Sequence, residues 1–125
     1  MREGNIVAEK SMEFAVRIIK LYSYLCEEKR EHVMSKQLLR SGTSVGANVK
    51  EAIYAQSRKD FASKMSIGLK EASETEYWLE LLNKTGYLTN EQYQSLQSDC
   101  GELAKMLIAI VRSTKANCSL LRDIC

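Results

Sequence analysis

Four polar residues at helical spacing form the group in this sequence most suited to chemistry: Arg40, Ser44, Asn48 and Glu51. Residues three or four positions apart lie on one face of a helix, so Ser44, Asn48 and Glu51 are neighbours there. A carboxylate and an amide on one face could serve a catalytic pocket, but the sequence places no nucleophile or metal ligand nearby. Polar groups near a core are normally hydrogen-bonded, so we interpret these residues as a structural network that fixes helix register or a subunit contact.

A metal or cofactor site is the second kind of chemistry to consider, and the spacing of the ligand residues argues against it. Zinc sites use thiolates and imidazoles at short spacings. The four cysteines include no C-x-x-C pair, and His32 is the only histidine. We therefore predict no metal and no cofactor. An enzyme that uses Glu51 or His32 is the weakest functional hypothesis, because His32 falls in a charged connection without a thiol or carboxylate partner that the sequence identifies.

The composition favours an all-α fold. The chain has 125 residues, enough for one domain, and 45% of them are hydrophobic, which excludes a disordered chain. There is no proline and there are only six glycines, too few turn-forming residues for a β-sandwich or barrel. The longest apolar run, residues 106–111, is too short to cross a bilayer, and residues 1–5 lead into no apolar signal segment. We therefore expect a soluble, cytoplasmic protein without a membrane partner.

Apolar periodicity and capping signals divide the chain into helices expected at about residues 7–30, 35–55, 58–85 and 90–118. Ser35 and Ser57 are predicted N-caps, and Thr89 with Gln92 forms a predicted capping box. Gly86 is typical of the left-handed residue that ends a helix. Long helices with short connections predict an antiparallel up-down-up-down four-helix bundle that occupies the whole chain as one domain. The charged run at residues 27–31 is expected to be a solvated helix end and connection.

Small residues in the second and third predicted helices indicate close helix packing. Folding the chain back at residue 57 pairs Gly46 with Gly68 and Gly42 with Ala72. Each glycine in a helix costs about 1 kcal/mol relative to alanine, so a compensating interaction is required. We expect the two backbones to approach closely at these positions.

Residues 37–52 (QLLRSGTSVGANVKEA), taken with residues 57–61 and 67–75, resemble the bacterial four-helix bundle proteins. That family includes the intervening-sequence proteins encoded inside some large-subunit ribosomal RNA genes. A distant relation is the accessory protein of diversity-generating retroelements. The resemblance covers nearly the whole chain, with one departure, since Ala52 stands where the family often has glycine.

This resemblance implies a cyclic homo-oligomer without enzymatic activity. Family members are similar to pentamers of four-helix bundles around a central channel. The distant relation is a basic pentamer that engages reverse transcriptase and nucleic acid. Ala52 in place of glycine favours a longer, straighter second helix and leaves the bundle prediction unchanged.

Surplus apolar residues lie outside the predicted core faces. Tyr77 and Trp78 stand off the main apolar face of the third helix, beside Leu81, and the first helix carries apolar residues on more than one face. Such residues indicate either a second intrachain contact or an interface between subunits. The sequence alone leaves both open, and the resemblance favours an oligomer.

One end of the predicted bundle is basic and the other acidic. Clustered positive charge favours phosphate binding through counterion release, whereas an ordinary solvated face is the alternative. No aromatic residues are interleaved with the basic ones, so recognition of particular bases is not supported. The candidate nucleic-acid-binding residues are Lys50, Arg58, Lys59, Lys64, Arg112 and Lys115.

The leading hypothesis is a non-enzymatic homo-oligomer, pentameric by resemblance, that presents this basic surface to RNA, DNA or a nucleic-acid-processing protein. The alternative is a protein-protein interaction scaffold with no nucleic-acid role, in which the charge asymmetry orients a protein partner.

Overall fold

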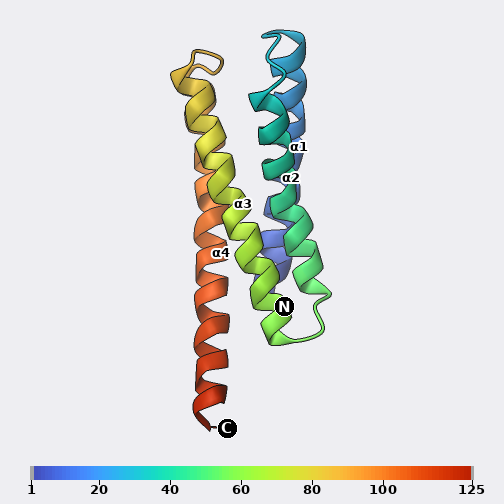
Figure 1. The fold of residues 1–125 in the computed structure, drawn as a ribbon, viewed down its shortest axis with the longest axis vertical. Helices are drawn as coiled ribbons and strands as arrows, with labels where there is room; N and C mark the ends of the chain where they lie inside the picture. Colours follow the sequence, from blue (N-terminus) through green and yellow to red (C-terminus); the bar gives the residue numbers. More distant parts are fainter. Residues whose placement is uncertain (1, 125) are drawn as a thin grey trace.

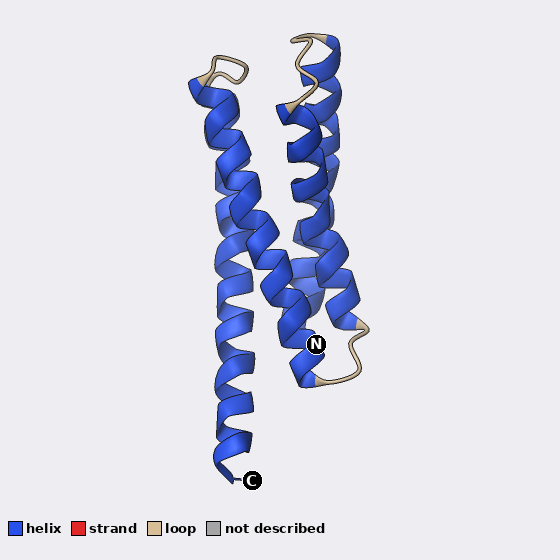
Figure 2. Ribbon diagram, in the orientation of Figure 1, coloured by secondary structure: helices blue, strands red, loops and turns tan. Residues whose placement is uncertain are grey.

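The computed structural model describes the backbone of residues 2–124 and the side chains of residues 5–114. Its helices are α1 (Arg2–Glu27), α2 (Met34–Ile53), α3 (Arg58–Lys84) and α4 (Asn90–Ile124) (Figures 1 and 2). Residues 2–124 contain no strand, so the all-α prediction is confirmed. Within that range, no helix combines the length and the apolar character needed to cross a membrane.

Consecutive helices lie side by side, and their apolar faces form one core. α1 packs on α2, α2 on α3 and α3 on α4, while α1 and α4 contact one another less extensively. The last part of α4 extends past the ends of the other helices (Figure 1). The largest fully buried side chains come from every helix and include Phe14, Ile18, Leu25, Leu38, Val45, Val49, Met65, Leu79, Leu82, Leu103 and Leu107. Burying these side chains supplies the main driving force for the fold.

Local hydrogen bonds at the helix ends agree with several capping predictions. The Ser57 hydroxyl accepts a bond from the Asp60 backbone N–H at 3.0 Å, which confirms the N-cap of α3. Thr89 and Gln92 bond reciprocally, at 2.9 and 3.1 Å, as the predicted capping box requires. Gly86, with φ of 86°, lies in the left-handed region just after α3.

The prediction that Ser35 caps α2 is wrong, because Glu31 does so. The Glu31 carboxylate accepts bonds from the backbone N–H groups of Val33, Met34 and Ser35, at 3.0, 2.9 and 2.7 Å. The Ser35 hydroxyl donates to the Glu31 carbonyl oxygen at 2.8 Å, inside the helix. Glu31 is only 8% exposed, so the charged run is not solvated throughout. Burial alone would raise the pKa of Glu31, but the bonds from the backbone lower that pKa below its ordinary value.

The prediction that Gly42 and Gly46 face α3 is wrong, because both face α1, whereas the expected close approach of the α2 and α3 backbones is found at Gly68. A Cβ atom on Gly42 would lie 2.8 Å from Cγ1 of Ile18 in α1, and one on Gly46 would lie 3.3 Å from the Ser11 hydroxyl, also in α1. On the α3 side, a Cβ on Gly68 would lie 3.6 Å from the Val45 carbonyl oxygen. Pairing by residue number does not fix the rotation of a helix about its axis. In the structure that rotation turns Gly42 and Gly46 toward α1.

Candidate functional site

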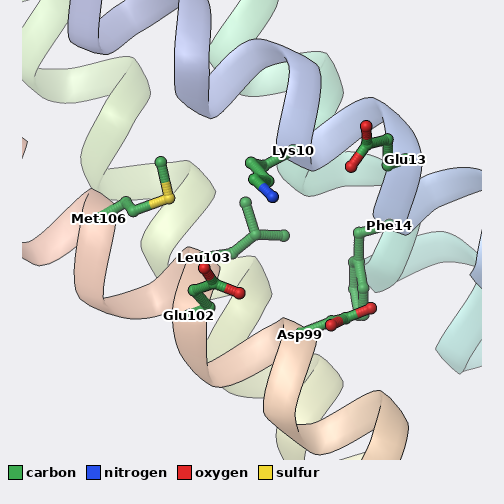
Figure 3. A pocket seen from close by; sticks show the side chains of 7 residues that line it. All are labelled: Lys10, Glu13, Phe14, Asp99, Glu102, Leu103 and Met106. Atoms are coloured by element: carbon green, nitrogen blue, oxygen red, sulfur yellow. The ribbon is translucent and has the colours of Figure 1, made fainter.

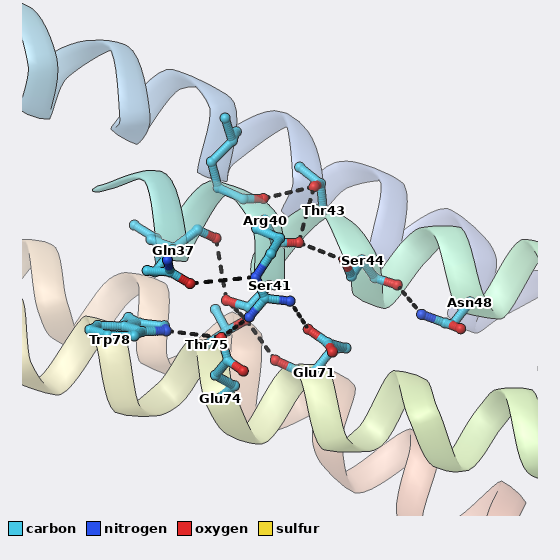
Figure 4. A network of polar contacts seen from close by, with 12 residues as sticks. Gln37, Arg40, Ser41, Thr43, Ser44, Asn48, Glu71, Glu74, Thr75 and Trp78 are labelled. Carbon is cyan, nitrogen blue, oxygen red and sulfur yellow. Dashed lines mark hydrogen bonds and ion pairs between the residues drawn. The ribbon is translucent and has the colours of Figure 1, made fainter. Parts of the chain in front are cut away.

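A polar cluster joins the middle of α2 to α3 (Figure 4). The Arg40 guanidinium pairs with Glu71, at 3.2 Å, and with Glu74. Glu74 also accepts a hydrogen bond from the Trp78 indole N–H at 3.0 Å. The Trp78 hydrogen bond lowers the pKa of Glu74, and Arg40 acts in the same direction, while partial burial opposes both. The cluster therefore fixes the register of α2 against α3.

Two buried hydroxyl groups extend this cluster into the core. The Thr75 hydroxyl lies 2.9 Å from the Ser41 hydroxyl and 2.8 Å from the Glu71 carbonyl oxygen. Both side chains are fully buried. Sequence reasoning did not assign Ser41 or Thr75 to the network. The available signal was a hydroxyl residue at a core position of each helix.

The other predicted members of the network bond mainly within their own helix. The Ser44 hydroxyl donates to the Arg40 carbonyl oxygen at 2.6 Å, and the Asn48 amide donates to the Ser44 carbonyl oxygen at 2.9 Å. Glu51 contacts α3, where its carboxylate accepts from the Lys64 ammonium at 3.2 Å. The structure thus brings Arg40 and Glu51 to the α2–α3 contact. The Ser44 hydroxyl and the Asn48 amide instead form bonds within α2.

The predicted basic residues near the ends of α3 and α4 lie toward one end of the molecule. Gly68 packs near Leu107, and from there α3 runs to lower numbers and α4 to higher ones toward the same end (Figure 1). Arg58 and Lys59 are exposed in the first turn of α3, and Arg112 is exposed on α4. The side chain of Lys115 lies outside the described residues.

The two remaining basic candidates have different surroundings. Lys64 is engaged by Glu51, as described above, so part of its charge is compensated. Lys50 lines a groove of about 360 Å³ between α1 and α2. Lys50 is in the last turn of α2, close to the start of α3, so it lies toward the same end of the bundle but on the lining of this groove.

The groove between α1 and α2 is the larger of the surface depressions described here. Its exposed apolar residues include Met12 and Tyr54, which are 60% and 78% exposed and which sequence reasoning did not single out. The wide apolar stripe of the first helix was the only signal for Met12, and Tyr54 directly follows α2. The residues that line it are Asn5, Ala8, Ser11, Met12, Ala15, Thr43, Gly46, Ala47, Lys50, Ile53 and Tyr54.

A family model for the 23S rRNA-intervening sequence proteins matches residues 3–109, which is most of the chain. The chain belongs to this family. A comparison with curated protein sequences gives no match. A similar solved structure is that of a protein with unknown function from the S23 ribosomal protein family of Bacteroides thetaiotaomicron. It is 59% identical, with a TM-score of 0.87, and the alignment covers 88% of this chain and 98% of that one.

The α2–α3 polar cluster and the α1–α2 groove both lie within the part of the chain that matches the intervening-sequence family model. The α2–α3 cluster, Lys50, Arg58 and Lys59 all fall within residues 3–109, whereas Arg112 and Lys115 lie beyond that range. A second, smaller depression of about 50 Å³ between α1 and α4 also falls within it, lined by three acidic residues, one lysine and three apolar residues (Figure 3). Among the described residues, no group of three or more His, Cys, Asp or Glu side chains has an arrangement that could hold a metal ion.

Proposed function

We propose that this intervening-sequence family protein is a non-enzymatic, up-down-up-down four-helix bundle that forms a cyclic homo-oligomer and binds nucleic acid through its basic end. A pentamer is the assembly that the family resemblance implies. The observation that carries the proposal is the exposure of Arg58, Lys59 and Arg112 toward one end of the bundle. Among the described residues, these three side chains form no ion pair.

Repetition by symmetry strengthens the case for phosphate binding. A single bundle offers only a few of these charges, and the whole chain carries a formal net charge of only +2. A ring of copies would bring several basic ends around one axis and raise the local positive potential. Each phosphate contact then releases counterions, so the binding depends steeply on salt.

Exposed apolar side chains support self-association. Met12, Val16 and Ile19 form a stripe along α1 and are 60%, 44% and 49% exposed. Patches of this kind on a small protein mark interaction surfaces. Trp78, in contrast, is engaged within the chain by Glu74, so it supports an intrachain role rather than an interface.

Ser41, Thr75 and Cys100 carry potential nucleophiles, but their surroundings favour a structural role. Ser41 and Thr75 are buried and hydrogen-bonded to one another. Burial raises the pKa of the Cys100 thiol to about 12, and the nearby carboxylates of Glu76 and Asp99 act in the same direction. A thiol with that pKa is almost entirely protonated at neutral pH and is a poor nucleophile.

Charge reversal at the basic end tests the nucleic-acid proposal. We expect the triple variant Arg58→Glu, Lys59→Glu, Arg112→Glu to bind fluorescein-labelled RNA and DNA oligonucleotides at least tenfold more weakly at low salt than the wild type. The matched control reverses Lys29, Lys36 and Lys84, which are exposed at or near helix ends away from that site. Equal binding by wild type and the basic-end variant, with both folded by circular dichroism, would contradict the assignment.

A protein-protein interaction scaffold is the second candidate, favoured by the apolar groove between α1 and α2. In that case the wild type would bind no oligonucleotide at low salt. Co-purification of a protein partner would then resist nuclease treatment.

A further inference from the structure

The α1–α2 groove is apolar and carries a single positive charge on its lining. Lys50 is the only charged residue among those that line it. The floor consists of small side chains, namely Ala8, Ser11, Ala15, Thr43, Gly46 and Ala47. Small residues let another helix approach closely, and the exposed side chain of Met12 would be buried by that approach.

The opposite side of α1 carries an acidic surface. The shallow α1–α4 depression is lined by the acidic residues Glu13, Asp99 and Glu102 and by one lysine, Lys10 (Figure 3). Arg17 pairs with Asp99 at 2.6 Å, so Glu13 and Glu102 remain as exposed carboxylates beside the exposed Lys10, and these three side chains carry a net charge of −1. Apolar area is present as well, because Met106 lines the depression.

The two surfaces lie at a similar level along the bundle. On the α2 side of α1, Ser11 lies against Gly46 in the groove. On the α4 side, Arg17 lies against Asp99 at the depression, fewer than two helical turns further along α1. The groove and the acidic face are therefore adjacent sides of one bundle that share α1.

We propose that copies of this chain associate head to tail, with the α1–α2 groove of one copy receiving the α1–α4 acidic face of the next. This inference rests on the self-assembly proposed above and goes further by naming the two surfaces that meet. The contact buries Met12 and Met106 and places Lys50 opposite Glu13 and Glu102. A second copy is the favoured occupant, because the same chain carries both complementary surfaces.

This geometry leads to a closed ring. A contact between two different surfaces is heterologous, and it closes when the rotation per copy divides a full turn. The two surfaces share α1 and face different directions, so each copy is rotated relative to the one before it, as a closed ring requires. In that ring α1 lies nearest the symmetry axis.

Light scattering on single-surface variants tests the proposal. We expect Met12→Glu, which places a charge in the groove, and the double variant Glu13→Lys, Glu102→Lys, which reverses the acidic face, each to have the mass of a monomer. The control is Tyr77→Glu, because Tyr77 is similarly exposed, at 56%, but lies on α3 outside both surfaces. That variant should keep the wild-type mass. If Met12→Glu does not fold, Lys50→Glu replaces it, since Lys50 is exposed and lines the groove.

Mixing the two monomeric variants gives the decisive result. The Met12→Glu chain keeps a native acidic face, and the double variant keeps a native groove, so an equimolar mixture should form dimers and nothing larger. No dimer in the mixture would overturn the head-to-tail arrangement. A wild-type mass for Met12→Glu would overturn the choice of surfaces while self-assembly stands, whereas a monomeric wild type would remove both proposals.

Discussion

Arg40 of α2 and Glu74 of α3 form an ion pair, and the indole of Trp78 donates to the same carboxylate. Trp78 lies one turn after Glu74, so the carboxylate joins an aromatic side chain of α3 to a cation of α2. This arrangement accounts for an aromatic residue off the main apolar face of α3. Its neighbour Tyr77, whose ring meets Trp78 edge to face at 5.0 Å between centroids, remains 56% exposed.

Replacing Glu74 with glutamine should destabilise the bundle modestly. Glu74→Gln removes the charge that pairs with Arg40 and weakens the bond from Trp78. Both partners of the ion pair are partly exposed, so we expect a loss of about 0.5–1 kcal/mol in the free energy of unfolding, measured by urea denaturation. The control, Glu80→Gln, affects a pair with Lys84 at 4.0 Å and should stay within about 0.5 kcal/mol of the wild type. Equal losses in the two variants would show that the cluster contributes nothing specific.

Acid should destabilise the protein partly through Glu31. A carboxyl group with a lowered pKa in the folded state stabilises the fold at pH values above its unfolded pKa, and this contribution disappears as pH falls through the folded pKa. The pKa of Glu31 is lowered from 4.5, so its contribution is complete at neutral pH and is lost below about pH 4.5. We expect the urea midpoint of Glu31→Gln to be lower than that of the wild type at pH 7 and to fall less between pH 5 and pH 3. Glu28→Gln, at an exposed position of the same connection, should follow the wild-type curve.

The contrast between Ser57 and Ser35 shows which parts of this fold the sequence predicts. The Ser57 cap and the Thr89–Gln92 box are bonds between residues three positions apart, so a local pattern identifies them. At α2, the backbone turns back at Arg30, with φ of 54°, and brings the carboxylate of Glu31 under the helix. Capping propensity alone predicts Ser35 as the N-cap of α2. In the structure this turn places the Glu31 carboxylate at the start of the helix instead.

The glycine contacts show a second limit of prediction. Hairpin arithmetic gives the level at which two helices meet, but it does not give the rotation of each helix about its axis. That rotation turns Gly42 toward Ile18 of α1 and leaves Ser41 to meet Thr75 of α3. The α1–α2 groove was not predicted for the same reason, because its outline depends on the rotation of α1 about its axis. The basic end was predictable from charge and helix order alone, whereas the position of Lys50 on the lining of the groove was not.

Substituting Gly42 with alanine should destabilise the protein. The added Cβ atom would lie 2.8 and 2.9 Å from the two γ-carbons of Ile18, a β-branched side chain with little freedom to move. We expect overpacking to cost about 1–3 kcal/mol and the better helix propensity of alanine to offset about 1 kcal/mol of that, which leaves a net loss of up to about 2 kcal/mol and a lower midpoint of thermal unfolding. Gly101→Ala is the matched control, because its Cβ would meet nothing within 4 Å, and it should stabilise α4 by about 0.5–1 kcal/mol. A neutral Gly42→Ala would mean that α1 shifts to accommodate the methyl group.

The salt dependence of oligonucleotide binding should report how many copies of the basic end contact one nucleic acid. For a single strand, the slope of log affinity against log salt changes by about 0.7 for each phosphate contact. Neutralising one exposed residue, as in Lys59→Gln, removes one contact from every copy that touches the strand. We therefore expect the slope to fall by a multiple of 0.7 in an assembled ring and by a single increment in a monomer. Lys84→Gln, at the far end of α3, should leave the slope unchanged. A Lys59→Gln variant that binds more weakly but keeps the wild-type slope would contradict direct phosphate contact at this residue.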